Sequence, residues 1–172
     1  MSLFIISQTF VGLSAILDVV SFQIKNRTII LSLLCISSLL ISAHFAILNQ
    51  WTAAFMLLIG ACRFLTGIFT YNVKMEYTFY FLTFITTVLS FENSLSIIAC
   101  IASLLHTRAS FSNHDKTMRV LMILGTGAWL FHDIFIGSPV AVLVDVLFIV
   151  SSLLGYYRIY KKTYKPKEPF ID

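Results

Sequence analysis

The chain has 172 residues, of which 58% are hydrophobic and only 12% are charged. A soluble domain needs about a quarter of its residues charged, so this composition excludes a soluble globular protein and indicates an integral membrane protein built of spanning helices. The net charge is +4, but the basic residues lie in short loops and a tail that flank apolar runs, which indicates topology signals rather than a nucleic-acid-binding face.

Apolar stretches follow one another along the chain, and each has the length of about 17–25 residues that a spanning helix needs. The first is not preceded by the basic segment of a secretory signal, so we expect it to be retained. The stretch 77–107 is interrupted by Glu92-Asn93-Ser94, and it forms either one overlong helix or two short ones. The other predicted spans are 3–24, 28–48, 52–71, 117–136 and 139–160.

The distribution of basic residues decides between six and seven spans. With seven spans and the N-terminus outside, eleven of the twelve Lys and Arg residues fall in cytoplasmic segments, and the twelfth, Arg63, lies inside a span. With six spans, the charge bias at the two ends of the chain would conflict. We therefore predict seven transmembrane helices, an external N-terminus and a cytoplasmic C-terminus.

The two halves of the chain share a layout. Each has a basic loop, a span that ends in a histidine, a tight uncharged turn and another span. His44 and His132 are 88 residues apart, and the same offset pairs Gly67 with Gly155. Three spans reverse the side of the membrane and a linker helix restores it, so the two repeats would run parallel.

The predicted fold is therefore an all-α integral membrane protein with a 3+1+3 organisation. It forms a single membrane domain, 1–172, made of repeat one (3–71), a linker helix (75–91), repeat two (94–160) and a basic cytoplasmic tail (161–172). This layout is analogous to that of the SWEET and PQ-loop transporters, and the analogy is one of layout only. Since no proline lies in the middle of a span, a proline-hinged motion is not expected.

Two segments, SAHFAILNQWTAAFMLLIGACRFLTG at 42–67 and GAWLFHDIFIGSPVAVLVD at 127–145, resemble the YgjV-type bacterial inner-membrane proteins. The resemblance covers most of the chain and implies the bacterial inner membrane as the location, without implying a reaction. The residues that it carries over are His44, Arg63, Asp145 and the W-x-x-H-[ND]-x-x-x-G-S run, which is Trp129, His132, Asp133, Gly137 and Ser138.

Ionisable side chains inside spans are costly and usually face a bundle interior or a water-filled cavity, so each is a candidate site. Asp18 and Arg63 lie about 10 and 12 Å from the cytoplasmic ends of their spans, at a rise of 1.5 Å per residue. Because their depths match and their charges are opposite, we predict that they pair. One hypothesis is a buried bridge that fixes packing, and the other is that Arg63 receives an anionic solute, with Asp18 as its resting partner.

A second group of ionisable residues, His44, His132, Asp133 and Asp145, lies near the outer ends of the spans. Since Asp133 directly follows His132, their side chains are expected to diverge by about 100° around the helix. A histidine–carboxylate group suits proton coupling or solute binding. The alternative is that each histidine caps a loop or hydrogen-bonds a neighbouring helix, and both interpretations stay open.

Motifs of catalytic or cofactor sites are missing from the sequence. There is no nucleophile–base spacing, HExxH or phosphate-binding loop, so neither an enzyme nor a cofactor is expected. The acidic and histidine residues lack the local spacing of a metal site. His106 and His114 lie at or in a basic cytoplasmic loop and are assigned no special role. The cysteines Cys35, Cys62 and Cys100 lie in apolar runs and are expected to be buried free thiols.

The favoured function is a small-solute transporter or permease that binds a small polar or anionic solute between the two repeats. Its site would be lined by Arg63, or by His132 and Asp145. The alternative is a non-transporting structural, regulatory or lipid-binding membrane protein. The lipid bilayer is the expected partner, no nucleic acid is expected, and formation of a homo-oligomer stays open.

Overall fold

The computed structural model describes residues 3–47, 51–91, 94–137 and 139–161, and all regular structure in them is helical. The interrupted stretch 77–107 divides into two helices, and every other predicted span contains one. The turn residues Asn49, Gln50 and Ser138 and the tail 162–172 lie outside the described residues. The helices are α1 (Leu3–Ser21), α2 (Arg27–Ile47), α3 (Trp51–Phe69), α4 (Val73–Leu89), α5 (Ser94–Ser110), α6 (Asp115–Ile136) and α7 (Pro139–Tyr156), which continues into a short π-helix, η1 (Tyr157–Lys161).

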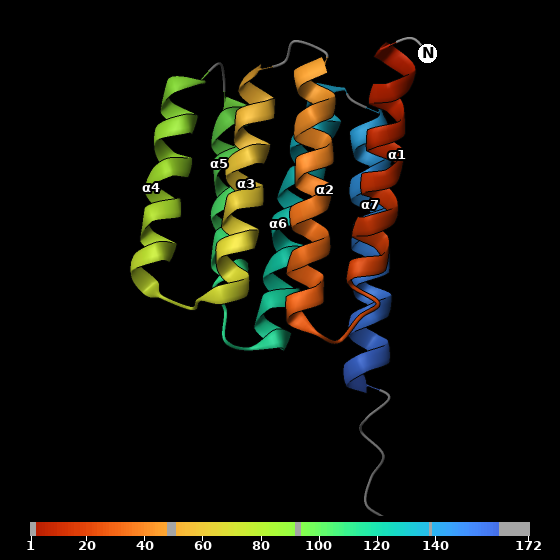
Figure 1. Ribbon diagram of the computed structural model, residues 1–172, viewed down its shortest axis with the longest axis vertical. Coiled ribbons are helices and arrows are strands. Elements are labelled where there is room, and N and C mark those ends of the chain that lie inside the picture. The colour runs from red at the N-terminus through yellow and green to blue at the C-terminus, as the bar shows by residue number, and fades with distance from the viewer. Residues whose placement is uncertain (1–2, 48–50, 92–93, 138, 162–172) are drawn as a thin grey trace, which may run out of the picture.

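The helices run side by side in two layers (Figure 1). Helices α1, α2 and α3 form one layer in chain order, with α2 between the other two, and α5, α6 and α7 form the second layer. Helix α4 stands at one edge and packs against α3 and α5. The layers also meet where α1 packs on α7 and where α3 packs on α5.

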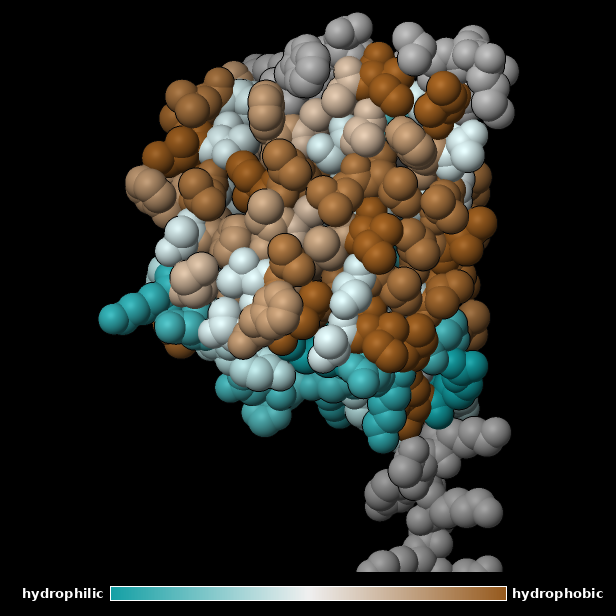
Figure 2. All heavy atoms as spheres, in the orientation of Figure 1, coloured by the Kyte–Doolittle hydropathy of each residue, from teal (hydrophilic) through white to brown (hydrophobic). Residues whose placement is uncertain are grey.

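The bundle has the surface of a membrane protein. Large apolar side chains are exposed over most of it, and hydrophilic residues gather at one end (Figure 2). That end, which we call the basic end, holds Lys25, Lys74, Arg108, Lys116 and Arg158. Within the described residues, three segments are both long and apolar enough to cross a membrane, namely Arg27–His44, Asp115–Phe135 and Val142–Tyr160, and three further apolar helices are shorter.

Small polar side chains fill much of the interior. Ser7, Ser14, Ser21, Ser37 and Thr107 are fully buried. Small residues let helices approach closely, and their hydroxyls bond across or along helices when no water is present. An arginine is buried as well. Arg119 on α6 has no exposed surface, although the distribution of basic residues places it in a cytoplasmic segment.

Two glycines lie very close to backbone carbonyls of neighbouring helices. A Cβ atom on Gly155 would lie 2.1 Å from the carbonyl oxygen of Phe22, and one on Gly67 would lie 2.6 Å from that of Ser110. Both carbonyls belong to helix ends, those of α1 and α5. Carbonyls at a helix C-terminus have no intrahelical donor, so they need partners from elsewhere.

Two arginines at the basic end supply these partners. Arg119 donates from Nη1 to the Phe22 carbonyl at 2.9 Å and from Nη2 to the carbonyl of Ile24. Arg27, at the start of α2, donates to the carbonyls of Ser110 and Gly67. A positive charge at the C-terminal end of a helix is also favourable for its dipole. Each arginine therefore ties the end of one helix layer to the other layer.

The cysteines are unpaired thiols with different environments. Cys35 is buried, Cys100 is half-buried, and Cys62 is exposed on the surface of the bundle. The expectation of burial is therefore wrong for Cys62. Helix α3 carries this cysteine on the outer surface of the bundle, where many large apolar side chains are also exposed.

Candidate functional site

Arg63 lies in the middle of α3, and its side chain is buried, with 6% of its surface exposed. Side chains of a helix lean toward its N-terminus. Accordingly, Nη2 of Arg63 runs back over the preceding turn and lies close to Gly60. The Arg63 guanidinium also lies over the Phe64 ring, 4.9 Å from its centroid.

The contacts of Arg63 are with neutral groups on α5. Nη1 donates to the carbonyl oxygen of Ser103 at 3.2 Å and to Oγ1 of Thr107 at 3.3 Å. None of the ion pairs among the described residues includes Arg63. Its Nε is buried and has no hydrogen-bond partner. An unsatisfied donor on a buried cation is costly, so this arginine is poorly compensated by its surroundings.

A small polar cavity adjoins the guanidinium, and we call it the Arg63 cavity. Three helices line it, with Met56, Ile59 and Arg63 from α3, Thr83 and Thr86 from α4, and Ser103 from α5. Its volume is about 10 Å³, which is room for about one water molecule. The cavity therefore places three side-chain hydroxyls and one arginine at the junction of α3, α4 and α5.

His106 is a second polar residue near Arg63 that sequence reasoning missed. It lies on α5, within the predicted stretch 77–107, where its Nε2 is 3.4 Å from the carbonyl of Met122 and 3.3 Å from Oγ1 of Thr126. A Cβ atom on Gly125 would collide with its ring, so the ring is packed tightly against α6. The signal that could have placed it is the continuous apolar run up to Leu105, which carries α5 past His106.

The predicted pair of Asp18 and Arg63 does not form. None of the ion pairs in the described part of the chain joins them, and Asp18 instead interacts with the side chain of Ser37 on α2. The reason is the order of the helices. Helix α2 lies between α1 and α3, so two residues of matching depth are kept apart.

The histidine and aspartate near the end of α6 contact each other. Nδ1 of His132 lies 2.7 Å from Oδ1 of Asp133, and both side chains are partly exposed. The expected divergence is therefore wrong, because rotation about the side-chain bonds brings the two polar ends together. The Trp129 ring packs edge-on against His132, with centroids 5.2 Å apart. An Asp133 that is engaged in this way orients the imidazole.

Asp145 on α7 interacts electrostatically with Asp133 and with Asp18 on α1. Its Oδ2 atom is buried and has no hydrogen-bond partner. His132 pairs with Asp133 rather than with Asp145. The acidic residues of the second group therefore lie in one region, and its role in proton coupling stays a prediction. Among the residues described, no group of three or more His, Cys, Asp or Glu side chains could hold a metal ion.

His44 belongs to a different environment from His132. It is buried on α2, and its Nδ1 lies 3.1 Å from the carbonyl of Ser7 on α1. The structure therefore divides the sequence candidates. Arg63 adjoins a cavity, and His44 contacts the backbone of a neighbouring helix. Asp145 interacts electrostatically with both Asp133 and Asp18.

Comparison with known proteins identifies the family. The sequence model of Imp-YgjV, described as a bacterial inner membrane protein, matches residues 5–163. The chain belongs to this family. It is therefore a protein of the bacterial inner membrane, as the resemblance predicts.

A curated relative agrees with this assignment. The chain is 24% identical over 137 residues to the inner membrane protein YgjV of Escherichia coli (strain K12), and the match covers 80% of the chain and 75% of the relative. No solved structure matches the chain.

Proposed function

We propose that the protein is a small-solute transporter of the inner membrane and that Arg63 binds an anionic solute. The observation that carries the proposal is the buried, unpartnered Nε of Arg63 beside a polar cavity. Arginine in a membrane interior is expensive and is usually associated with function. A bound anion would accept the hydrogen bond that Nε lacks and would neutralise the charge.

The position of the cavity supports a transport role. In the proposed organisation, α1–α3 form repeat one, α4 is the linker, and α5–α7 form repeat two. The Arg63 cavity has walls from α3, α4 and α5, so it lies where the two repeats and the linker meet. Solute sites of transporters built from repeats commonly lie at such a junction.

The close helix approaches support the repeat itself. Gly67 and Gly155 are 88 positions apart, and so are Phe22 and Ser110. Gly67 contacts Ser110, and Gly155 contacts Phe22. Each contact is therefore the other one with the two halves interchanged, as a two-fold relation between the halves requires. We accordingly propose seven spans, with the basic end in the cytoplasm, the N-terminus outside and the C-terminus inside.

The cavity has the size of one water molecule, so the proposal treats this conformation as closed. Any larger anion requires a helix to move. Helix α4 is the candidate, because it stands at the edge of the bundle. Within the described residues, its main packing partners are α3 and α5. The basic end, where Arg27 and Arg119 join the layers, would stay shut in this conformation.

The test is a stabilisation screen on purified protein in lipid nanodiscs. Unfolding temperature is measured with a panel of small anions, including acetate, lactate and inorganic phosphate, for the native chain and for Arg63→Gln. An anion present at about a hundred times its Kd stabilises the binding state by about 2.7 kcal/mol. We expect such stabilisation in the native chain and its loss in Arg63→Gln.

The matched control is Arg158→Gln, because Arg158 is exposed at the basic end and its guanidinium bonds the Gln23 carbonyl. This variant should keep the stabilisation. Uptake of the stabilising anion into proteoliposomes then tests transport itself. Binding without uptake above protein-free vesicles would favour a non-transporting, solute- or lipid-binding role. The absence of any Arg63-dependent anion would refute the proposed site.

A further inference from the structure

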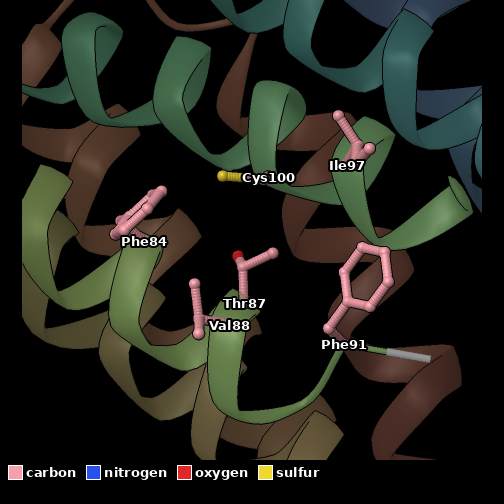
Figure 3. A pocket seen from close by; sticks show the side chains of 6 residues that line it. All are labelled: Phe84, Thr87, Val88, Phe91, Ile97 and Cys100. Atoms are coloured by element: carbon pink, nitrogen blue, oxygen red, sulfur yellow. The ribbon is translucent and has the colours of Figure 1, made fainter. Parts of the chain in front are cut away.

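A second and larger pocket opens between α4 and α5, with a volume of about 450 Å³ (Figure 3). Ligand sites commonly have volumes of about 300–1,000 Å³. The side chains that surround it are Phe84, Thr87, Val88, Phe91, Ile97 and Cys100. Except for one hydroxyl and one thiol, they are entirely apolar.

The pocket opens to the surface of the bundle. Phe84, Val88, Phe91 and Ile97 line it, and more than half of the surface of each is exposed. In an inner-membrane protein, this apolar surface faces hydrocarbon. An occupant with an apolar chain could therefore enter sideways from the bilayer, without crossing the polar basic end.

The pocket lies next to the Arg63 cavity, and α4 and α5 line both of them. Thr83 lines the cavity and Thr87 lines the pocket, and these buried residues are one turn apart on α4. Ser103 and Cys100 have the same relation on α5. One helical turn rises about 5.4 Å, so a polar space with a cation and an apolar space lie end to end between the same two helices.

We infer that the solute is a single-chain amphiphile, with a carboxylate head at Arg63 and an apolar chain in the α4–α5 pocket. This inference rests on the proposed function, since it names the substrate class of the same site. The Nε edge of a guanidinium carries two parallel N–H groups, which match the two oxygens of a carboxylate. The hydroxyls of Thr83 and Ser103, which also line the cavity, can donate to the same head group.

Other occupants leave part of the site unsatisfied. A hydrocarbon or a neutral chain would fill the apolar pocket and leave the Arg63 Nε without an acceptor. A small free anion would reach Arg63 and leave the pocket to bulk lipid. Only a molecule with both parts uses the two adjoining spaces, and its chain needs to be long enough to extend past Thr87 to Cys100.

The native cysteines provide a direct test. The Cys35→Ala variant keeps two thiols, Cys100 in the pocket and Cys62 exposed on α3 outside it. The full chain is placed in phosphatidylcholine nanodiscs and alkylated with N-phenylmaleimide, and the rate at each cysteine is followed by peptide mass spectrometry. Octanoate, acetate and octanol are added in turn, and Cys62 is the internal control for partitioning of the reagent.

The expected result is that octanoate slows alkylation of Cys100, by about tenfold at ten times its Kd, and leaves Cys62 unchanged. Acetate is too short to reach Cys100, and octanol lacks the charge, so neither should protect it. In Arg63→Gln, octanoate should lose its effect. Octanoate with a terminal diazirine gives a second measurement that does not depend on thiol reactivity, with cross-links expected at Phe84, Val88 or Ile97 and removed by unlabelled octanoate.

The outcomes separate this inference from the proposed function. If a small anion stabilises the protein through Arg63 while octanoate neither protects Cys100 nor competes for the cross-links, the inference is wrong and the proposed function survives. If octanol protects equally, or protection persists in Arg63→Gln, the pocket binds only apolar chains and the amphiphile is refuted. If no anion of either kind depends on Arg63, both proposals fail.

Discussion

Two buried arginines of this bundle, Arg119 and Arg63, differ in how completely their guanidinium groups are hydrogen-bonded. Arg119 has all three guanidinium nitrogens engaged, with Nε on Asp115 at 3.0 Å and the two others on the carbonyls of Phe22 and Ile24. Arg63 bonds two neutral acceptors from a single nitrogen, and its Nε has no partner. The first arginine is satisfied by the fold, and the second is not.

The difference shows what each residue does for the protein. Burial of a charge is tolerable when a counter-ion and hydrogen bonds compensate it, and Arg119 meets that condition at a junction between the two layers. Arg63 does not meet it. Arg27 also has a buried Nε without a partner, but its guanidinium lies 4.4 Å from the centroid of the Tyr71 ring and bonds two carbonyls. The buried charge of Arg63 is therefore less well compensated than that of Arg119.

The largest effect is expected from Arg119→Met. The substitution leaves the partly exposed Asp115 without its cation and removes the donors to the Phe22 and Ile24 carbonyls. Breaking a fully buried pair costs about 3–5 kcal/mol, and the two lost carbonyl bonds add to the loss of this partly exposed pair. The free energy of unfolding in nanodiscs should fall by this amount. Arg158→Met, at an exposed position, should change it by no more than about 0.5 kcal/mol. Equal effects of the two substitutions would show that Arg119 does not join the layers.

The helices themselves could be predicted from the sequence, because length and apolarity are properties of single segments. Each predicted span contains a helix, and the interrupted stretch 77–107 contains parts of two, α4 and α5. Arg63 was also identifiable, since a charge within an apolar run is visible without a structure. These features depend on the residues of one segment and on the bilayer as solvent.

Contacts between segments could not be predicted in the same way. Asp18 and Arg63 match in depth, but depth along a helix does not tell which helices are neighbours, and α2 separates them. Arg119 lies at the start of a span, where it is indistinguishable from a solvated loop charge. The apolar pocket between α4 and α5 depends on how far two helices diverge, which their composition does not specify.

A smaller loss of stability is expected from Gly155→Ala. This substitution tests the close contact between Gly155 and the Phe22 carbonyl, which also accepts a hydrogen bond from Arg119. The new Cβ would lie 2.1 Å from the Phe22 carbonyl oxygen, so α1 and α7 must separate. Overpacking of this kind costs about 1–3 kcal/mol. Gly67→Ala, with 2.6 Å to Ser110, should have the same sign and a smaller size.

Gly12→Ala is the matched control for the two glycine substitutions. Nothing lies within 4 Å of the position of its Cβ, and alanine is favoured over glycine in a helix interior by up to about 1 kcal/mol. This variant should be unchanged or more stable when thermal unfolding is measured under the same conditions. A loss of stability at Gly12 as large as that at Gly155 would refute the role of the close approaches.

The smallest effect on stability, and the one that decides the comparison, is expected from Arg63→Met. Removal of the guanidinium leaves no orphaned partner, because the Thr107 hydroxyl still donates to the Ser103 carbonyl at 2.8 Å. Replacing a buried, incompletely compensated charge with an apolar side chain also removes the cost of desolvating that charge. Chemical unfolding should therefore show a native chain no more stable than the variant, whereas anion-dependent stabilisation should be lost. A fall in stability of the size expected for Arg119→Met would instead make Arg63 a structural residue, and the cavity beside it would then be a packing defect rather than a site.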